Sequence, residues 1–538
     1  MLDSNRNQAP VSTLGRNPWT ACMRRIRQLV ALIIILALAA CGPGAAPDTS
    51  ALRVGIEDQP KTLDPRFATD VYGMRIASQL LFSTLVRHGD DLRIVPDLAE
   101  RWETPDPTTY LFYLRDHVTF HDGVPLTAQD VVFTFRHLMD PATQSPFGPT
   151  FRDQIVAVEA VSPLVVRFRL QQPTAAFLTS IIMPILPQHL LEGKEATAFP
   201  ARLVGSGPFR FVSQTSQAIT LEANPDYYDG APSLPRIVFA IIKDNNTRFL
   251  KARKGELDLL INALPPERIA DFQKPPLNQS YTMTEGPGIS YNYLACNFQD
   301  KLVANPLVRQ AVAQAVDVQE IIAHRLSGHA LPATGLLSSV NWFYDPRVTG
   351  PAHDPAKARA LLSQAGYPDP DGDGPAAAIA LELKTSNNAE SVNIARILQA
   401  QMAQAGIRLD IKSYEWGTFY GDIQKGNFQL TMMRWVGVTE PDFYYDIFHS
   451  SQFPPAGRNR GRYSNPAMDQ LLAAGRVTLA PDKRQAIYSQ VQKLAASDLP
   501  YVSLWHLNTV SIVNHRVQGY RQHPMASFFS FRHITLAP

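Results

Sequence analysis

The sequence predicts an α/β or α+β fold built from more than one lobe, and three observations support that class. Its 538 residues suffice for two or three domains with a large core. Apolar residues alternate over 379–383 and 407–411 and recur at helical spacing over 395–405, which predicts a strand–helix–strand unit with parallel strands. The same succession of patterns occurs earlier, over 237–261.

Local signals predict further elements. Thr127 is suited to cap a helix, with Asp130 placed to reach back as in a capping box. Asn305 followed by Pro306 predicts the N-terminus of another helix. A strand over 110–114, with its continuation over 118–120, precedes the first of these helices.

The N-terminal segment has the pattern of a secretory signal. Three arginines over 24–27 precede an apolar run over 29–40, and small residues lead directly to Cys41. This end of the run resembles the lipobox of bacterial lipoproteins, which implies that residues 1–40 are removed and that Cys41 carries a lipid. The alternative is an uncleaved anchor, but the 12 apolar residues are too few to span a bilayer.

The start of the leader has two interpretations. Met23 stands just before the arginines, so residues 1–22 are either an upstream extension or a mis-assigned start. Residues 41–50, rich in Gly, Ala and Pro, are predicted to be a flexible lipidated tether. We therefore expect an extracytoplasmic protein, on the periplasmic side or at the cell surface, held to a membrane through Cys41.

The amino-acid composition excludes some classes of binding partner. Without residues 1–40 the chain has 45 basic and 47 acidic residues, and this near-neutral balance argues against nucleic acid. After Cys41 no segment approaches the 18 apolar residues of a membrane helix. Removal of Cys22 with the leader and lipidation of Cys41 would leave Cys296 without a disulfide partner.

Catalytic and metal-binding motifs are not found in the sequence. The HExxH, GxSxG and P-loop patterns are absent, and Gly205-Ser206-Gly207 has the wrong spacing for a nucleophile elbow, so a glycine turn is favoured. His117 and His121 are separated from a shared helical face by the turn that follows. The acidic stretch 369–374 matches the start of a calcium loop, but its twelfth position is Ala380. We predict no catalytic residues, metal or cofactor.

Short motifs with a characteristic order run along the mature chain. They are Pro96–Trp102, Tyr110–Arg115, Phe120–Phe133, Leu186–Leu191, Gly205–Phe209, Ala223–Tyr228, Val308–Ala311 with Val316 and Asp317, and Arg462–Pro466 with Asp469, Leu471 and Leu472. This ordered set resembles the dipeptide/oligopeptide (family 5) solute-binding proteins of ABC importers.

The resemblance implies a bilobal, periplasmic-binding-protein-like (type II) α/β fold with an additional third lobe. Lobe I is expected to comprise 51–86, 203–286 and 501–538, lobe II (the extra lobe) 87–202, and lobe III 287–500. Two lobes would close on a ligand about a hinge. A membrane permease and cytoplasmic ATPases would then import that ligand.

The candidate ligand site begins at the end of a strand expected over 428–433. In open α/β sheets, ligands lie beyond the carboxyl ends of strands, which makes Arg434 and Trp435 candidates. The resemblance places Trp435 and Trp416 in the cleft, where flat aromatic faces accept varied side chains. The alternative is that both tryptophans are core residues.

One departure from the family pattern concerns the ligand's amino group. The position where peptide-binding members carry an amine-binding Asp is Val438 here. Either Glu440 or Asp442 takes over that role, or the ligand has no free amino terminus there. Tyr293 and Asn297, on the segment expected to enter lobe III, complete the candidate set.

The predicted function is capture of peptides or peptide-like small solutes and their delivery to an ABC import permease, by a protein expected to be a monomer and not an enzyme. One alternative is an extracytoplasmic sensor with the same fold. A cell-envelope hydrolase is another, which the missing nucleophile and metal motifs disfavour.

Overall fold

A computed structural model describes residues 49–194, 203–371 and 376–537. The predicted leader (1–40, with 1–22), Cys41 and nearly all of the tether (41–50) lie outside these ranges, as does part of the acidic stretch 369–374. In the described ranges, no helix has both the length and the hydropathy that a bilayer span requires. No trio of His, Cys, Asp or Glu side chains in those ranges is arranged to hold a metal ion.

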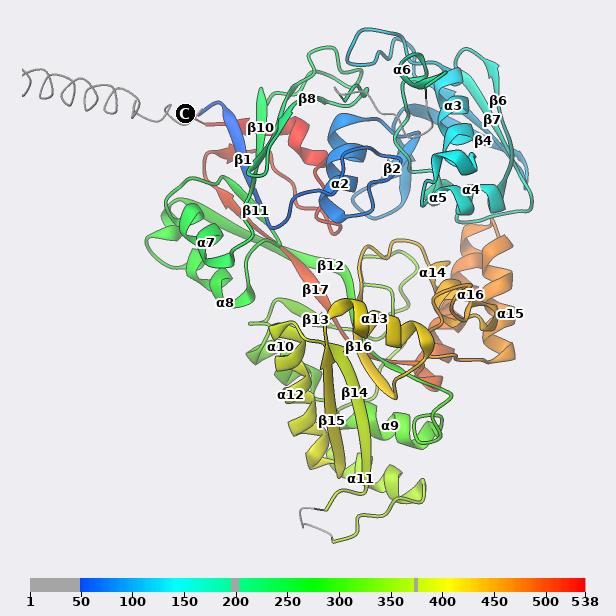
Figure 1. The fold of residues 1–538 in the computed structure, drawn as a ribbon, viewed down its shortest axis with the longest axis vertical. Coiled ribbons are helices and arrows are strands. Elements are labelled where there is room, and N and C mark those ends of the chain that lie inside the picture. Colours follow the sequence, from blue (N-terminus) through cyan, green and yellow to red (C-terminus); the bar gives the residue numbers. More distant parts are fainter. Residues whose placement is uncertain (1–48, 195–202, 372–375, 538) are drawn as a thin grey trace, which may run out of the picture. The chain divides into compact units, whose positions relative to one another are not determined.

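An 11-stranded mixed sheet forms the centre of the fold (Figure 1). Its main path runs β15-β14-β16-β12-β17-β11-β1-β10-β9-β8, and β13 pairs with β17 beside this path. The strand bounds are β1 Ala51–Ile56, β8 Phe209–Gln214, β9 Ala218–Ala223, β10 Arg236–Ile241, β11 Leu259–Ile261, β12 Tyr281–Cys296, β13 Ala330–Pro332, β14 Ile379–Ser386, β15 Ile407–Tyr414, β16 Leu430–Trp435 and β17 Tyr501–Asn514.

Both predicted strand–helix–strand units are confirmed. Strands β14 and β15 are parallel and joined by α12 (Ala389–Gln404), whose apolar face packs into the same core as both strands. In the earlier unit, β10 leads through α7 (Asn245–Arg253) to β11. The strands β10 and β11 both pair in parallel with β1, which lies between them.

A second, four-stranded antiparallel sheet has the order β4-β5-β7-β6 and falls within predicted lobe II. Helix α3 (Ala128–Met139) covers it, and Thr127 and Asp130 form the predicted capping box. The part predicted as a strand over 118–120 forms only an isolated bridge at Thr119, so that expectation was wrong. The strand bounds are β4 Ala99–Asp106, β5 Thr109–Leu114, β6 Ile155–Ser162 and β7 Val165–Leu170.

The remaining elements surround these sheets, and the lobe boundaries stay predictions. The predicted N-cap at Asn305 is confirmed for α9. The other helices are α2 Val71–Ile76, α4 Gly148–Gln154, α5 Phe177–Ser180, α6 Gln188–Leu191, α8 Pro266–Ile269, α9 Pro306–Ala315, α10 Val318–His324, α11 Pro355–Gln364, α13 Trp416–Lys425, α14 Phe443–Phe448, α15 Pro466–Val477 and α16 Pro481–Asp498, and the short strands are β2 Val86–His88, β3 Ile94–Pro96, β18 Val517–Gln518 and β19 Thr535–Leu536.

Strands β12 and β17 join the two halves of the large sheet (Figure 1). They are antiparallel over twelve paired positions, and the register shifts between Gly286 and Ser290. Three residues of β12 there oppose Asn508 alone, which is an enlarged β-bulge. A Cβ at Gly288 would lie 2.4 Å from the carbonyl oxygen of Leu507, so the strands approach closely only because this residue is glycine.

Asp258, just before β11, links the ends of strands β11, β1 and β17. Its side chain is fully buried and accepts hydrogen bonds from the guanidinium groups of Arg53 in β1 and Arg516 just after β17, at 2.8 to 3.0 Å. Burial alone would raise the pKa of Asp258, but the hydrogen bonds from Arg516 and Arg53 outweigh it and leave this pKa below its usual value.

Replacement of Asp258 by Asn should lower the free energy of unfolding by about 3 kcal/mol, since two guanidinium groups lose their shared charge partner. Because the folded-state pKa lies below the unfolded one, the stabilisation is present above about pH 4 and is lost as the pH falls through the folded value. Urea unfolding between neutral and acidic pH measures both effects. Asp226→Asn, which alters the exposed pair with Arg210, should change stability by less than about 1 kcal/mol.

The bulge gives a second prediction. Gly288→Ala should lower the melting temperature, because the new Cβ forces β12 away from the Leu507 carbonyl. Gly286→Ala in the same strand is the matched control, since its Cβ would meet only the end of the Gln522 side chain at 3.5 Å. Equal melting temperatures for the two variants in thermal unfolding would show that the close approach does not matter.

Candidate functional site

A cleft of about 1200 Å³ lies against the β12–β17 junction. One wall comes from the segment after β1 and from α2, and another from the loops after β11 and β16. Thr179, Ile182 and Met183 of predicted lobe II line it as well. The bulge residues Ile289 and Ser290 contribute to its floor. The volume exceeds the roughly 300 to 1,000 Å³ of common small-molecule pockets, which suits a ligand of several linked groups.

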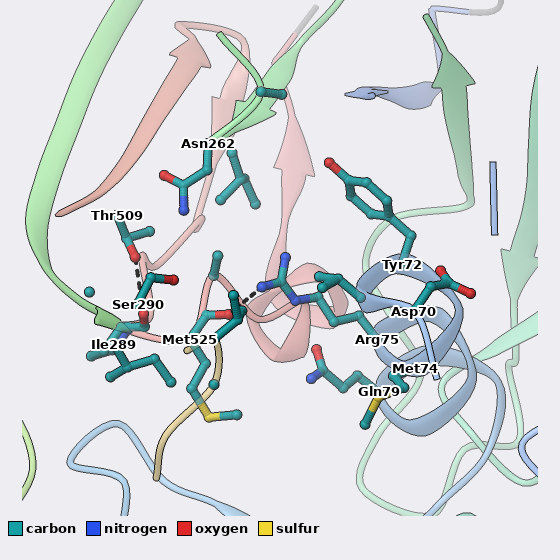
Figure 2. A pocket seen from close by; sticks show the side chains of 18 of the residues that line it. Asp70, Tyr72, Met74, Arg75, Gln79, Asn262, Ile289, Ser290, Thr509 and Met525 are labelled. Carbon is teal, nitrogen blue, oxygen red and sulfur yellow. Dashed lines mark hydrogen bonds between the residues drawn. The ribbon is translucent and has the colours of Figure 1, made fainter. Parts of the chain in front are cut away.

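Arg75 shows how the wall formed by α2 is held (Figure 2). Its guanidinium reaches from α2 to donate a hydrogen bond to the main-chain oxygen of Met525, at 2.7 Å. Burial lowers its pKa to about 10. Neighbouring Tyr72 also lines the cleft, and burial raises the pKa of its phenol to about 12, so both side chains keep their ordinary protonation at neutral pH.

The opposite side of the same space presents polar groups held by the backbone. Asn262 has a left-handed conformation (φ 51°), and its side-chain oxygen accepts a hydrogen bond from the Val510 N–H at 2.7 Å. The Thr509 hydroxyl donates to the Pro524 carbonyl at 3.0 Å. Figure 2 shows both side chains, with Ser290, around the cleft. These contacts fix the directions of the Asn262 and Thr509 side chains at the cleft.

Carboxylates and cations both line the cleft. Glu57 stands just after β1 and forms an ion pair with Arg248 at 3.1 Å. Burial raises the pKa of Glu57, and the positive charge of Arg248 partly opposes that rise. Asp70 caps α2 by accepting a hydrogen bond from the Gly73 N–H at 2.8 Å. The cations Lys61, Arg75 and Arg434 line the same cleft, so a zwitterionic ligand finds both signs of charge there.

Arg434 is the candidate that the structure places in the cleft wall. It belongs to β16, opposite Asn292 of β12, and its side chain is exposed to the cleft solvent. Desolvation of the guanidinium by the surrounding protein lowers the pKa of Arg434, and the negative charge of Glu57 opposes this shift. Among the described residues, Arg434 forms no ion pair and no hydrogen bond through its side chain. Its guanidinium therefore has its full donor capacity available to a ligand.

The two tryptophans lie outside the cleft lining. Trp435 stacks beside Tyr293, meets Phe443 edge-on with ring centroids 5.0 Å apart, and has the Arg460 guanidinium 4.7 Å above its ring. Trp416 is 55% exposed and stacks on Tyr420 of the same helix. Their role in ligand binding stays a prediction.

Glu440 and Asp442 both have cationic partners within the protein. Glu440 pairs with Arg484, and Asp442 lies 3.3 Å from Arg476. Burial raises the pKa of each carboxyl group, against the lowering effect of these arginines. A ligand ammonium would have to compete with these arginines for either carboxylate. Val438, at the position of the usual amine-binding Asp, is buried in an apolar cluster.

Tyr293 and Asn297 occupy the core beside β12. Tyr293 is 1% exposed and stacks on Tyr501, with ring centroids 4.0 Å apart. The Asn297 amide donates to the carbonyl oxygens of Gly426 and Phe428 at 2.9 and 2.7 Å, which fixes the turn before β16. Neither residue lines the described cleft, and a ligand contact for them stays a prediction.

Several cleft residues were missed by the sequence analysis: Glu57, Asp70, Tyr72, Arg75, Asn262 and Thr509. They come from segments about 450 residues apart in the sequence, and none stands in a motif with catalytic or metal-binding spacing. The structure also bears on whether Ser206, in the segment Gly205-Ser206-Gly207, could act as a nucleophile. The hydroxyl of Ser206 is buried without a hydrogen-bond partner among the described residues, so no general base activates it.

Comparison with known proteins identifies the family. The model for the middle region of bacterial extracellular solute-binding proteins, family 5, matches residues 93–454. Di/tripeptide-binding protein 4 of Pseudomonas aeruginosa is 30% identical, over 92% of this chain and 97% of its own. Heme-binding protein A of Haemophilus influenzae is 28% identical, over 86% of this chain and 88% of its own.

This chain is also similar to a solved structure of a peptide-binding protein. The oligopeptide-binding protein AppA of Bacillus subtilis, in complex with a nonapeptide, is 28% identical with a TM-score of 0.74, and the alignment covers 91% of this chain and 99% of AppA. The central sheet, the additional four-stranded sheet and the cleft agree with the type II binding-protein fold predicted from the sequence. This chain belongs to the family 5 bacterial extracellular solute-binding proteins.

Proposed function

We propose that this protein binds peptides or peptide-like solutes in the cleft and hands them to an ABC permease coupled to cytoplasmic ATPases. Family membership gives the general role, which is extracytoplasmic capture of a solute for import and not catalysis. The free guanidinium of Arg434 carries the finer proposal, because a planar cation with five donors suits a ligand carboxylate. The named ligands of two relatives, di/tripeptides and a nonapeptide, support the same class.

The rest of the cleft suits such a ligand. A peptide carries amide groups along its length, and Asn262, Ser290 and Thr509 offer polar atoms beside the β12–β17 junction. Its amino terminus could approach the carboxylates that line the cleft, including Asp58 and Asp70. We propose that Glu440 and Asp442 serve the protein's own ion pairs, and that Trp416, Trp435, Tyr293 and Asn297 shape the cleft from outside its lining.

Arg434→Gln should weaken binding of a tripeptide with a free carboxyl group at least tenfold, which corresponds to about 1.4 kcal/mol. The physical reason is the loss of a charge-assisted hydrogen bond to the ligand carboxylate. Titration calorimetry with a panel of tripeptides measures the change. The same tripeptides with an amidated C-terminus should bind the variant and the unmodified protein equally.

The matched control is Lys301→Gln, which removes one positive charge from an exposed position that does not line the cleft. It should leave both dissociation constants unchanged. A variant at Arg434 that binds free and amidated tripeptides as tightly as the unmodified protein would remove the carboxylate assignment. Uptake of a bound peptide by cells with and without the protein separates import from a sensor role.

We also propose that residues 1–40 are a signal peptide, that Cys41 carries the lipid that holds the protein to a membrane, and that the mature protein is a monomer. Cys41→Ser should abolish incorporation of labelled palmitate and move the protein from the membrane to the soluble fraction. Cys22→Ser, within the leader, should change neither result. Palmitate labelling that persists in the Cys41 variant would contradict the proposal.

A further inference from the structure

We propose that Glu440 is a positioning residue that latches predicted lobe II onto predicted lobe III and so slows release of the ligand. The inference rests on the proposed function, because it concerns how long the same cleft retains its ligand. It assigns to Glu440 a role other than contact with a ligand cation.

The contact on the lobe II side comes from the segment around α5. The hydroxyl of Thr179 donates a hydrogen bond to Glu440 Oε2 at 3.2 Å, and the N–H of Ala175 donates to the carbonyl oxygen of Arg476 at 2.8 Å. Thr179 also lines the cleft, as does Thr439 next to Glu440. The hydrogen bond therefore joins Thr179, which lines the cleft, to the residue next to Thr439 in the loop after β16.

The lobe III side is built to hold Glu440 still. Arg484 donates to Glu440 Oε1, while its Nε–H donates to the Gly475 carbonyl at the end of α15, at 3.1 Å. The Arg484 side chain is 6% exposed and its guanidinium lies over the rings of Phe343 and Tyr488, 5.1 and 5.3 Å from their centroids. Glu440 thus presents its second oxygen to Thr179 in a fixed direction.

A second acid–base pair supports the neighbouring contact. Asp442 lies 3.3 Å from the Arg476 guanidinium, which lies over Tyr445 at 4.0 Å. The main-chain oxygen of this same arginine accepts the Ala175 N–H. Each cross-lobe hydrogen bond therefore ends on a residue whose side chain is already paired.

The contact between predicted lobes II and III is small compared with the pairing of β12 with β17. Besides these two hydrogen bonds, Arg93 lies over the ring of Trp342 at 5.3 Å. Twelve paired positions hold β12 to β17. A few hydrogen bonds and one cation–π contact can form and break as domains move. Their strength then sets how long the cleft stays shut, and so the dissociation rate of a ligand inside it.

Thr179→Val removes the hydroxyl with little change of shape and should raise the dissociation rate of a fluorescent tripeptide about tenfold, because the acceptor is a charged carboxylate. Stopped-flow competition should show an unchanged association rate, and thermal unfolding an unchanged melting temperature. Thr179→Ser, which keeps the hydroxyl, should restore the slow rate.

The matched control is Thr174→Val, because among the described residues the Thr174 hydroxyl bonds only to the Gln172 carbonyl in the same loop. It should leave dissociation unchanged. A dissociation rate that does not move in Thr179→Val, or that rises equally in the Thr174 variant, would overturn the latch.

If no tested peptide binds, that result counts against the proposed function but does not test the latch. A measurement without ligand then tests the latch by itself. Spin labels at Val161→Cys in β6 and Lys425→Cys in α13 report the separation between the lobes. The added Thr179→Val substitution should broaden the distance distribution toward longer values in double electron–electron resonance. An identical distribution with and without Thr179→Val would refute the latch independently of any ligand.

Discussion

The long antiparallel pairing of β12 with β17 is the constraint on which the rest of the structure depends. It joins β15-β14-β16 to β11-β1-β10-β9-β8 in a single sheet, so every cleft residue is positioned relative to these two strands. The register shift at Gly286–Ser290 lies at the floor of the cleft. Glu285, beside the bulge, accepts hydrogen bonds from Asn508 at 2.6 Å and contacts His329 at 3.0 Å, which ties the irregular part of the ladder to a third segment.

Glu440, Asp442 and Arg434 are all predicted from the sequence as ligand-binding residues. In the structure they differ in whether they already have an ion-pair partner within the protein. Glu440 and Asp442 are half-buried next to arginines, and removing an arginine would leave a partly desolvated carboxylate without a charge partner. Arg434 is in the opposite situation, because it faces the cleft and its side chain forms no hydrogen bond or ion pair with the described residues. The distinction between structural and ligand-facing charges therefore follows from which groups already have partners and not from their distance to a motif.

The sequence predicted those parts of the fold whose signals are local. The alternation over 379–383 and 407–411 and the caps at Thr127 and Asn305 each depend on a few neighbouring residues, and the structure contains them. The strand expected over 428–433 is present but shifted to Leu430–Trp435, so Arg434 and Trp435 lie within it and not beyond its end.

The cleft was predicted only in part, because its residues are brought together by strand pairing. Arg75, on the short helix α2, meets the main chain at Met525, 450 residues later. Arg484, in α16, pairs with Glu440 in the loop before α14, 44 residues earlier. No periodicity or local spacing in one sequence specifies such contacts, so the partners of Glu440 and Asp442 could not be foreseen.

The order of strands in the large sheet has a consequence for biogenesis. Strand β11 needs β17 on one side, yet its register partners Leu259 and Val513 are 254 positions apart in the sequence. Closing so long a loop is slow. Strands β1, β10 and β11 can pair with one another early, but β11 and β12 each lack their β17 partner until nearly the whole chain has been synthesised. The large sheet is therefore completed only by its last strand along the chain, β17, after the other ten strands have been synthesised.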